Sequence, residues 1–495
     1  MKNNSVIKPI ITILTAAVFL AFCFDMKAES IRTSSFAFLI ICTVVIVVTF
    51  RKNLPSTGTF YAMLTGMFLK IAYAIYTPVW CRQHDVIDFG AGEGHAAYME
   101  YILSHKALPD FDPRSVWAFF QPPLHHIVSA VWMWLNIRLG ISEGRMHKNV
   151  QILPLTYMCL LMFITYMICR ELGMRKQGML AAMLVASFHP VFILMSGSIN
   201  NDALSVMLTV LAIYIAILWY LYPTTGKIIA LAFAIGLAMS AKLSSALVAP
   251  PVAVMMIYKI MNDTGKLKDK PKLISYILEL AAFAVVVLPL GLWWTVRNRI
   301  LFDMPANYIP PVGEPVEKFG FIPTFADVRT ASPFLYMKAN GFSYDEYNFI
   351  LSSIKSSLFG EGDFARISPV VTLVGWLLFA AAVIIVVIQI IAMLRTCCVS
   401  EAGPDSGIKI FLASVVIVFL AGYTAFALSG KNLSAMNPRY CGAVFTVLPV
   451  FTGLYCDRLI ATSKKTAGYV IISALLVFAT LSCAFYLSVG LLQSL

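Results

Sequence analysis

Residues 81–126 read CRQHDVIDFGAGEGHAAYMEYILSHKALPDFDPRSVWAFFQPPLHH and form the first long polar interruption in a mostly apolar chain. The stretch gathers groups that exchange protons. These are the carboxylates of Asp85, Asp88, Glu93, Glu100, Asp110 and Asp112 and the imidazoles of His84, His95, His105, His125 and His126. It follows directly on an apolar run that ends near Trp80. We therefore treat the other segments as a frame built around it.

The composition of the chain is that of a membrane protein. Of its 495 residues 59% are hydrophobic and only 13% are charged, whereas soluble domains carry roughly 25% charged residues. Many apolar runs approach the about 20 residues that a helix needs to cross a bilayer. We assign the net charge of +12 to cytoplasmic loops, where Lys and Arg concentrate. We do not assign it to nucleic-acid binding.

The apolar runs predict an all-α polytopic membrane protein with about 13 transmembrane helices. The predicted spans are 8–24, 35–50, 59–80, 149–169, 178–196, 203–221, 228–241, 244–258, 273–294, 368–394, 408–428, 441–457 and 468–491. The piece 122–137 is short and begins with two prolines and two histidines. Trp132 and Trp134 suit headgroup depth, so we place this piece on the membrane surface as an amphipathic helix.

Basic loops predict the orientation. The loop around Lys259–Lys272 is the most basic short loop, and it lies inside only if 122–137 does not cross the membrane. We therefore expect the N-terminus inside, the C-terminus outside, and two large outer loops, 81–148 and 295–367. Residues 1–58 form two extra spans, 59–294 the core and 368–495 the last helices. We expect multi-pass insertion in the plasma (inner) membrane, with the active site on the outer face.

Three carboxylates of the first outer loop are candidates for a general base. Asp85 comes five residues after Trp80, at the mouth of a predicted span. A carboxylate fixed there and partly desolvated is suited to accept a proton. Asp88 and Glu93 are rivals in the same loop. The alternative interpretation of Asp85 is a solvated charge at a helix end.

Basic residues on the same side predict a pocket for phosphate. Lys242 separates two short apolar runs, so it lies below the membrane surface, where an ionisable group is a functional candidate. Arg439 opens a later span, and Arg297 and Arg299 follow another. Arg binds phosphate in a bidentate manner and Lys binds it as a point charge. Lys70, within the third span, is a second buried cation.

Other polar residues complete the predicted substrate-binding set. Asn201 and Asp202 precede an apolar run, where they either cap a helix or reach the substrate. We interpret His125 chiefly as interfacial packing beside His126, with substrate contact as the alternative. The full set is His95, Gln121, His125, Asn201, Asp202, Lys242, Arg297, Arg439 and Tyr440. The loop carboxylates permit a divalent metal, but their spacing matches no metal template, so we assign no metal ligand and no certain cofactor.

The order of these features resembles a known family. An acidic residue follows a span; then come GHAAYMEYI, an LP turn, QPPLHH, a span ending in NND, a buried lysine and a late NPRY. This arrangement over residues 59–456 is similar to the GT-C superfamily of membrane glycosyltransferases. Within it, the chain resembles the family of protein O-mannosyltransferases and lipid A aminoarabinose transferases.

The resemblance implies transfer of a sugar from a polyprenyl-phosphate carrier at the outer face, usually with inversion and without a divalent metal. The acceptor, a lipid, a glycan or a protein segment, is left open. The family's base lies in the first outer loop, often as an Asp-Glu pair. Here the sequence is His84-Asp85-Val86, so the choice between Asp85 and Asp88 remains open.

Two other classes of protein compete with this interpretation. A lipid or glycan transporter, such as a flippase of the cell envelope, accounts for many spans and for Lys70 and Lys242. Transporters of this kind are typically built from internal repeats, and none is evident in the sequence. A non-catalytic assembly protein for surface polysaccharide is the third candidate, and it predicts no saturable binding of lipid phosphate.

Overall fold

The computed structural model describes residues 56–81, 86–306, 308–310, 322–330, 332–334, 348–362, 364–398, 403–430 and 435–493. Within these ranges the chain is helical and contains no strand. The predicted spans 8–24 and 35–50 fall outside the described residues, and so does Asp85.

The helices of the first half are α3 (Thr57–Tyr76), α4 (Gly94–His105), η2 (Pro113–Ser115), α5 (Leu124–Arg138), α6 (Glu143–Asn149), α7 (Ile152–Glu171), α8 (Lys176–Phe188), α9 (Pro190–Met195), α10 (Asp202–Leu221), α11 (Thr225–Ala241), η3 (Leu243–Val248) and α12 (Ala249–Asp263). They are followed by α13 (Lys270–Phe302), η4 (Ile322–Ala326), α14 (Phe349–Phe359), α15 (Pro369–Cys397), α16 (Ser406–Gly430), η6 (Pro438–Cys441), α17 (Val444–Ala461) and α18 (Lys465–Gln493).

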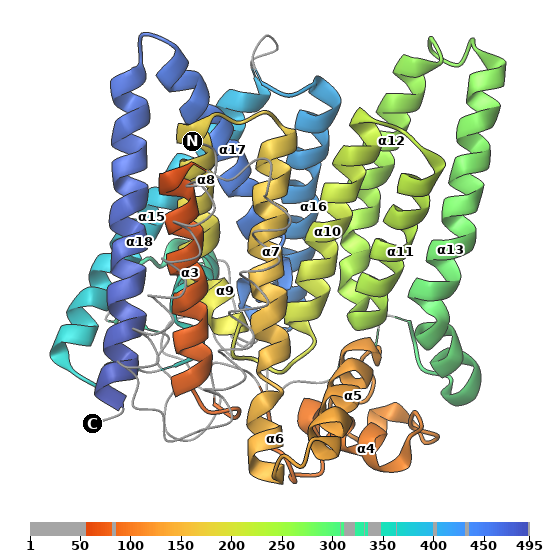
Figure 1. The fold of residues 1–495 in the computed structure, drawn as a ribbon, viewed down its shortest axis with the longest axis vertical. Coiled ribbons are helices and arrows are strands. Elements are labelled where there is room, and N and C mark those ends of the chain that lie inside the picture. The colour runs from red at the N-terminus through yellow and green to blue at the C-terminus, as the bar shows by residue number, and fades with distance from the viewer. Residues whose placement is uncertain are drawn as a thin grey trace, which may run out of the picture.

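Nine stretches of the described chain are long and apolar enough to cross a membrane. They are Thr57–Tyr76, Glu143–Glu171, Asp202–Leu221, Leu243–Asp263, Lys270–Phe302, Pro369–Cys397, Ser406–Ser429, Val444–Ala461 and Lys465–Leu492. Their helices run side by side through one bundle (Figure 1). The chain is therefore a multi-pass integral membrane protein.

One predicted span is broken in the structure. Residues 178–196 do not form a single helix, because α8 ends at Phe188 and α9 starts at Pro190. Proline lacks an N–H and disfavours helical geometry in the residue before it. His189 accordingly adopts an extended backbone, and its Nδ1 accepts the N–H of Val191 at 3.3 Å.

Lys70 lies wholly buried beside this break. Its ammonium group donates to the carbonyl of Ser187 at 2.6 Å and to that of Gly66 at 3.4 Å. The last carbonyls of a helix have no partner within the helix. Lys70 of α3 therefore closes the end of α8 inside the membrane frame, and this contact accounts for its burial.

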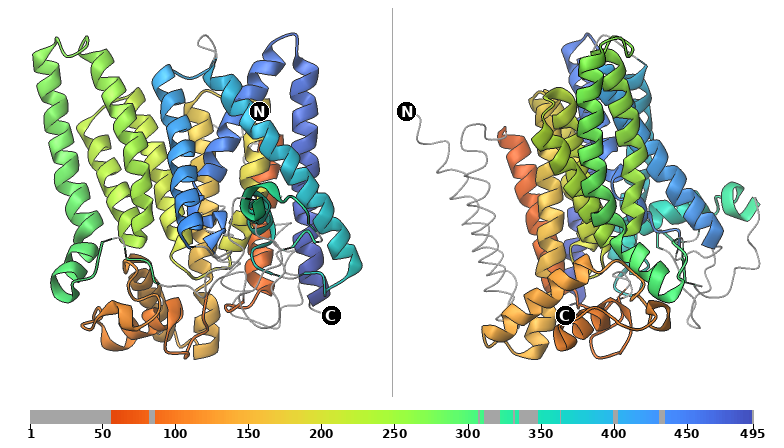
Figure 2. Two further views of the ribbon diagram at one scale, coloured as in Figure 1. Left: turned by 180° about the vertical axis from the view of Figure 1, so that it is seen from behind. Right: turned by 90° about the vertical axis from the view of Figure 1, so that its right-hand side faces the viewer.

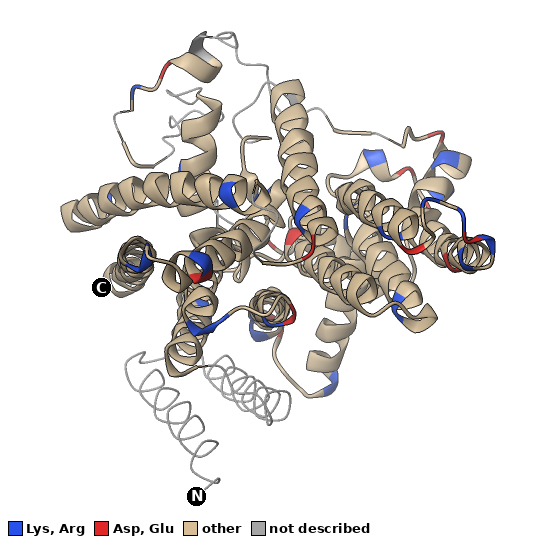
Figure 3. Ribbon diagram, turned by 90° about the horizontal axis from the view of Figure 1, so that it is seen from above, with Lys and Arg blue, Asp and Glu red and all other residues tan. Residues whose placement is uncertain are grey.

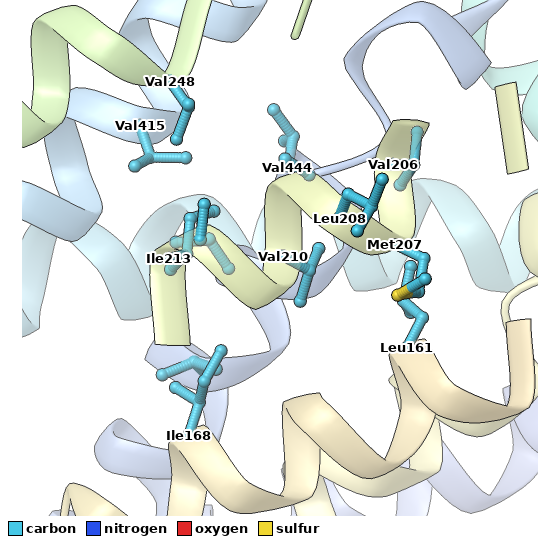
Figure 4. Close-up of a cluster of buried hydrophobic side chains, with 14 of the residues drawn as sticks. Leu161, Ile168, Val206, Met207, Leu208, Val210, Ile213, Val248, Val415 and Val444 are labelled. Carbon is cyan, nitrogen blue, oxygen red and sulfur yellow. The ribbon is translucent and has the colours of Figure 1, made fainter. Parts of the chain in front are cut away.

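The centre of the bundle is formed by α10. Its buried Val206, Met207, Leu208, Val210 and Ile213 extend towards several other helices (Figure 4). Leu161 and Ile168 of α7, Val248 of η3, Val415 of α16 and Val444 of α17 belong to the same buried cluster. The N-terminus of α10 is thus fixed by packing on several sides. In contrast, α13 is largely uncovered along its length, which suits a helix that faces lipid.

The first polar stretch lies beyond one end of the bundle. Figures 1 and 2 show α4, α5 and α6 grouped there, next to the C-terminal ends of α3 and α13. The piece predicted at 122–137 is α5, a helix of 15 residues that is not among the candidate spans. It packs against α4 and α6. This position agrees with the prediction that it does not cross the membrane.

Contacts with α13 hold the first polar stretch in place. Trp294 donates from Nε1 to the carbonyl of Phe120 at 3.0 Å, and Arg114 donates to the carbonyl of Phe302 at 2.8 Å. The ring centroids of Phe120 and Tyr308 are 5.6 Å apart. The start of the second large loop therefore lies at the same end of the molecule as the first.

Candidate functional site

Hydrogen bonds of the turn before α10 join three segments of the chain. Asn200 Oδ1 accepts the N–H of Asp202 at 3.1 Å, which shapes the turn locally. Asn201 Nδ2 donates to the carbonyl of Ala241, at the end of α11, at 2.8 Å and to Oε1 of Gln121 at 3.3 Å. Asn201 and Gln121, both predicted to bind substrate, thus join the first polar stretch to the bundle.

Asp202 is paired with two cations. One carboxylate oxygen, Oδ1, accepts from the ammonium group of Lys242, and Oδ2 lies 3.2 Å from Nε of Arg439. The exposed fraction of the side chain is 5% for Asp202, 14% for Lys242 and 7% for Arg439. These three residues were predicted separately, from different parts of the sequence, and the structure brings them together. Removing charges from water is costly unless they are paired, and here each has its partner.

Tyr440 lies against both cations. Lys242 Nζ is 4.6 Å from the centre of its ring, and the guanidinium carbon of Arg439 is 4.9 Å from it. An aromatic face attracts cations at such distances. The tyrosine hydroxyl also accepts from Arg439 Nη2 at 2.9 Å. Tyr440 thus orients the cations.

These four residues line a pocket. The other lining residues are Ser205, Val206, Thr209, Ser244, Ser245, Phe419, Gly442 and Ala443. Among all twelve, the charged groups are Lys242, Arg439 and Asp202, so the lining carries one net positive charge. A small pocket with hydroxyls, two cations and one carboxylate is suited to bind an anion.

The polar face of α10 is a feature that the sequence prediction did not include. Ser205 and Thr209 follow Asp202 at helical spacing, so all three project from one side of the helix. The sequence alone contains the signal for this polar face, because a serine and a threonine follow the aspartate by three and seven residues in an otherwise apolar helix. Ser245 and Phe419, by contrast, come from other segments and leave no such local pattern.

Histidines of α4 and α5 connect the first polar stretch to the turn. His125 donates from Nε2 to the carbonyl of Ile199 at 2.7 Å. His126 Nε2 lies 2.9 Å from His95 Nδ1, and its ring stacks on Tyr98 at 4.3 Å. Both His125 and His126 are 0% exposed. Both side chains are packed inside the protein, because α4 and the turn cover this face of α5.

Burial also sets the charge of these histidines. It lowers the pKa of His125 to about 4, although the hydrogen bond to Ile199 opposes the shift. Burial lowers the pKa of His126 well below its ordinary value, and the neighbouring His95 and His125 lower it further. Both rings are neutral at pH 7. His95, half-buried, lies within electrostatic range of Asp202.

The predicted bases occupy different surroundings. Asp88 and Glu93 are exposed, and Asp88 accepts the N–H of Phe89 at 2.9 Å. Asp85 is outside the described residues, but the next residue, Val86, is buried in an apolar cluster with Ile199. Ile199 is three residues before Asp202. Val86 of the first polar stretch and Ile199 of the turn that carries Asp202 thus belong to one apolar cluster.

Arg297 does not line the pocket. Its guanidinium donates to Oδ1 of Asn298 at 2.8 Å and to the carbonyl of Pro109, and it lies 4.8 Å from the ring of Trp294. It thus fastens the first polar stretch to α13. The predicted basic pocket contains two of its expected cations, Lys242 and Arg439, and Arg297 has a different set of contacts.

A family model covers the centre of this arrangement. Residues 125–293 match the model described as dolichyl-phosphate-mannose-protein mannosyltransferase. The matched region includes the turn before α10 and Lys242, whereas Arg439 lies beyond it. Over these residues the resemblance to the family of protein O-mannosyltransferases is confirmed. A comparison with curated protein sequences finds no match.

Solved structures with a similar arrangement include ArnT from Cupriavidus metallidurans bound to undecaprenyl phosphate, at 13% identity and a TM-score of 0.49 over 88% of this chain and 77% of that one. The oligosaccharyltransferase from Archaeoglobus fulgidus in the apo form has the same identity and TM-score over 88% of this chain. AglB of that organism, in complex with an inhibitory peptide and a dolichol-phosphate, has 11% identity and a TM-score of 0.48 over 88% of this chain. The chain spans 56% of the length of these archaeal proteins.

Proposed function

We propose that this protein is a membrane glycosyltransferase that moves a sugar from a polyprenyl-phosphate carrier to an acceptor at the end of the bundle where α4–α6 lie. The observation that carries the proposal is the pocket in which Lys242 and Arg439 converge on Asp202, at the start of α10. The turn before this helix is hydrogen-bonded to Gln121 of the first polar stretch, whose carboxylates are the candidate bases. The leaving group requires cations and the acceptor hydroxyl requires a base.

The chemistry follows from these two parts. A loop carboxylate, with Asp85 as first choice and Asp88 and Glu93 as rivals, accepts the proton of the acceptor hydroxyl. The acceptor oxygen then bonds to the anomeric carbon as the bond from that carbon to the phosphate oxygen breaks. The electron pair leaves with the phosphate, whose growing charge Lys242 and Arg439 stabilise. Attack from the side opposite the phosphate inverts the anomeric centre.

The location of the reaction is part of the proposal. We place the loop end of the bundle outside the cell and count thirteen spans, with the N-terminus inside and the C-terminus outside. Figure 3 looks onto the other end, where Lys and Arg occupy helix ends and loops. Basic residues at the ends of α7, α8, α12, α13, α15 and α18 include Arg170, Lys176, Lys259, Lys272, Arg395 and Lys465, and Arg175 and Lys464 adjoin two of these ends. Basic loops stay in the cytoplasm, which supports this orientation in the inner membrane.

Transfer from a panel of polyprenyl-phosphate sugars tests the proposal. Purified protein receives each radiolabelled donor, with total membrane lipid as acceptor, and the product is separated by chromatography. We expect the wild type to transfer label to the acceptor, and we expect the rate of transfer to be lower by a factor of about 10²–10⁴ in Asp85→Asn. The matched control, Asp303→Asn, makes the same chemical change at an exposed carboxylate. Vesicle flux of the lipid with no covalent product from any donor would overturn the proposal in favour of a flippase.

A further inference from the structure

Asp202 forms ion pairs with the two cations that the proposed reaction needs to bind phosphate. Each carboxylate oxygen faces a different cation, Lys242 through Oδ1 and Arg439 through Oδ2. All three side chains line the same pocket, so an incoming phosphate meets an anion already in place. The carboxylate is held by the first turn of α10 and cannot leave with the ligand.

The charge of the ligand changes during the proposed reaction. A polyprenyl-phosphate sugar is a phosphodiester and carries one negative charge. The polyprenyl phosphate that leaves is a monoester, with about −1.5 to −2 charges at pH 7. Two cations without a counter-anion would attract the released polyprenyl phosphate far more strongly than the donor, because the electrostatic attraction increases with the charge of the ligand.

We propose that Asp202 is a resident counter-anion that weakens the hold of Lys242 and Arg439 on the dianionic product and so permits its release. This inference rests on the proposed function. With Asp202 the pocket presents one net positive charge, and without it the pocket presents two. The carboxylate therefore lowers the affinity for both lipids, and it lowers the affinity for the monoester more.

Two lipid probes test the inference. Undecaprenyl phosphate stands for the product and its methyl ester, a phosphodiester, stands for the donor. Saturation binding of each is measured on purified full-length wild type, Asp202→Asn and Asp303→Asn. Asp303 has an 85% exposed side chain paired with Arg299 at 2.7 Å, and its left-handed backbone (φ 50°) is one that asparagine tolerates. It therefore controls for the loss of one carboxylate charge at the same end of the molecule.

We expect Asp202→Asn to bind undecaprenyl phosphate about tenfold or more tightly than the wild type, with a smaller gain for the methyl ester. Asp303→Asn should match the wild type for both lipids. In turnover, Asp202→Asn should lower kcat and KM together, because product release becomes slow. Equal tightening for both lipids, or none, would overturn the inference.

A second pair of variants covers the case in which Asp202→Asn does not fold, since it leaves two buried cations without a counter-charge. Lys242→Met and the double variant Lys242→Met/Asp202→Asn also differ only in the charge of Asp202. The double variant should prefer the monoester more strongly than the single variant does. The two proposals fail in different ways. Saturable, Lys242-dependent binding without the predicted selectivity removes only the inference, whereas no saturable binding in the wild type removes the proposed function as well.

Discussion

At the scale of single residues, Lys242 is the side chain on which phosphate binding should depend most. It stands between α11 and η3, reaches Asp202, and lies over the ring of Tyr440. We expect Lys242→Met to weaken binding of polyprenyl phosphate by about ten- to hundredfold, the range of a hydrogen bond to a charged group. Saturation binding with radiolabelled lipid measures this effect.

The control for that variant is Lys227→Met. Lys227 lies near the start of the same helix, α11, at the opposite end of the bundle, and its ammonium group donates to the carbonyl of Tyr222. Its replacement should leave lipid binding unchanged. Thermal unfolding of both variants separates lost binding from lost folding. Equal loss of binding in folded Lys227→Met and Lys242→Met would contradict the assignment of the pocket.

Two buried histidines make stability depend on pH. Because burial lowers the pKa of His125 to about 4 and that of His126 well below its ordinary value, the unfolded chain binds more protons than the folded one below about pH 6.5. Stability is thus fully present above that pH and is lost as the pH falls. Each histidine contributes a slope of up to about 1.4 kcal/mol per pH unit.

Thermal unfolding of the purified protein between pH 7 and pH 5 checks this prediction. The melting temperature should fall on acidification, and it should fall less steeply in His126→Asn. His105→Asn is the control, because His105 is exposed at the end of α4. If His126→Asn and the wild type showed the same pH dependence, the ring would not be a buried neutral group.

The chemical types of the site residues could be predicted, but their arrangement could not. Lys242 and Arg439 stood out because a charge within or beside an apolar run is costly. Their convergence on Asp202 depends on how α10, α11 and η6 pack, and no local pattern records that packing. The burial of His125 and His126 could not be predicted either, because only the fold shows that α4 and the turn before α10 cover them.

At the scale of helices, α8 and α17 pack through glycine. An added methyl group on Gly178 would stand 2.5 Å from the carbonyl oxygen of Gly453 and 2.4 Å from the carboxyl carbon of Asp457. Asp457 also accepts the N–H groups of Arg175 at 2.5 Å and Gly178 at 2.7 Å, which completes the start of α8 from a neighbouring helix. The close approach and the cap depend on the same small residue.

We expect Gly178→Ala to lower the free energy of unfolding by about 1–3 kcal/mol through overpacking. Gly226→Ala is the matched control in α11, because nothing lies within 4 Å of the position of its added carbon. Its effect should stay within about 1 kcal/mol and favour folding, since alanine is the better helix former. Thermal unfolding measures the stability of both variants. If Gly178→Ala were as stable as Gly226→Ala, the close packing of α8 on α17 at Gly178 would be contradicted.

Hydropathy predicted the position of most described helices well. Runs of apolar residues fix where a helix crosses, and predicted spans such as 203–221 and 368–394 coincide closely with α10 and α15. The errors have local causes. Pro190 breaks the span predicted at 178–196, and α13 continues to Phe302, past residue 294, because helices extend beyond the apolar core where nothing stops them.

At the scale of the whole molecule, the proposed orientation makes a prediction about chemical access. Cys397 and Cys398 are exposed at the end of α15, on the side that carries the basic loops. In inside-out vesicles a membrane-impermeant maleimide should label them, and the label should be lost in Cys397→Ser/Cys398→Ser. Ser104, exposed on α4, should be labelled as Ser104→Cys only from the outside of intact cells. The reverse pattern would invert the topology.

The position of the phosphate in an experimental structure of the protein with undecaprenyl phosphate tests the proposed site most directly. We expect phosphate density within hydrogen-bond distance of Lys242 and Arg439, next to the ring of Tyr440. The lipid chain should leave the pocket between helices of the bundle. Density for the phosphate at another site, with the ion pairs of Asp202 unchanged and the pocket empty, would contradict it.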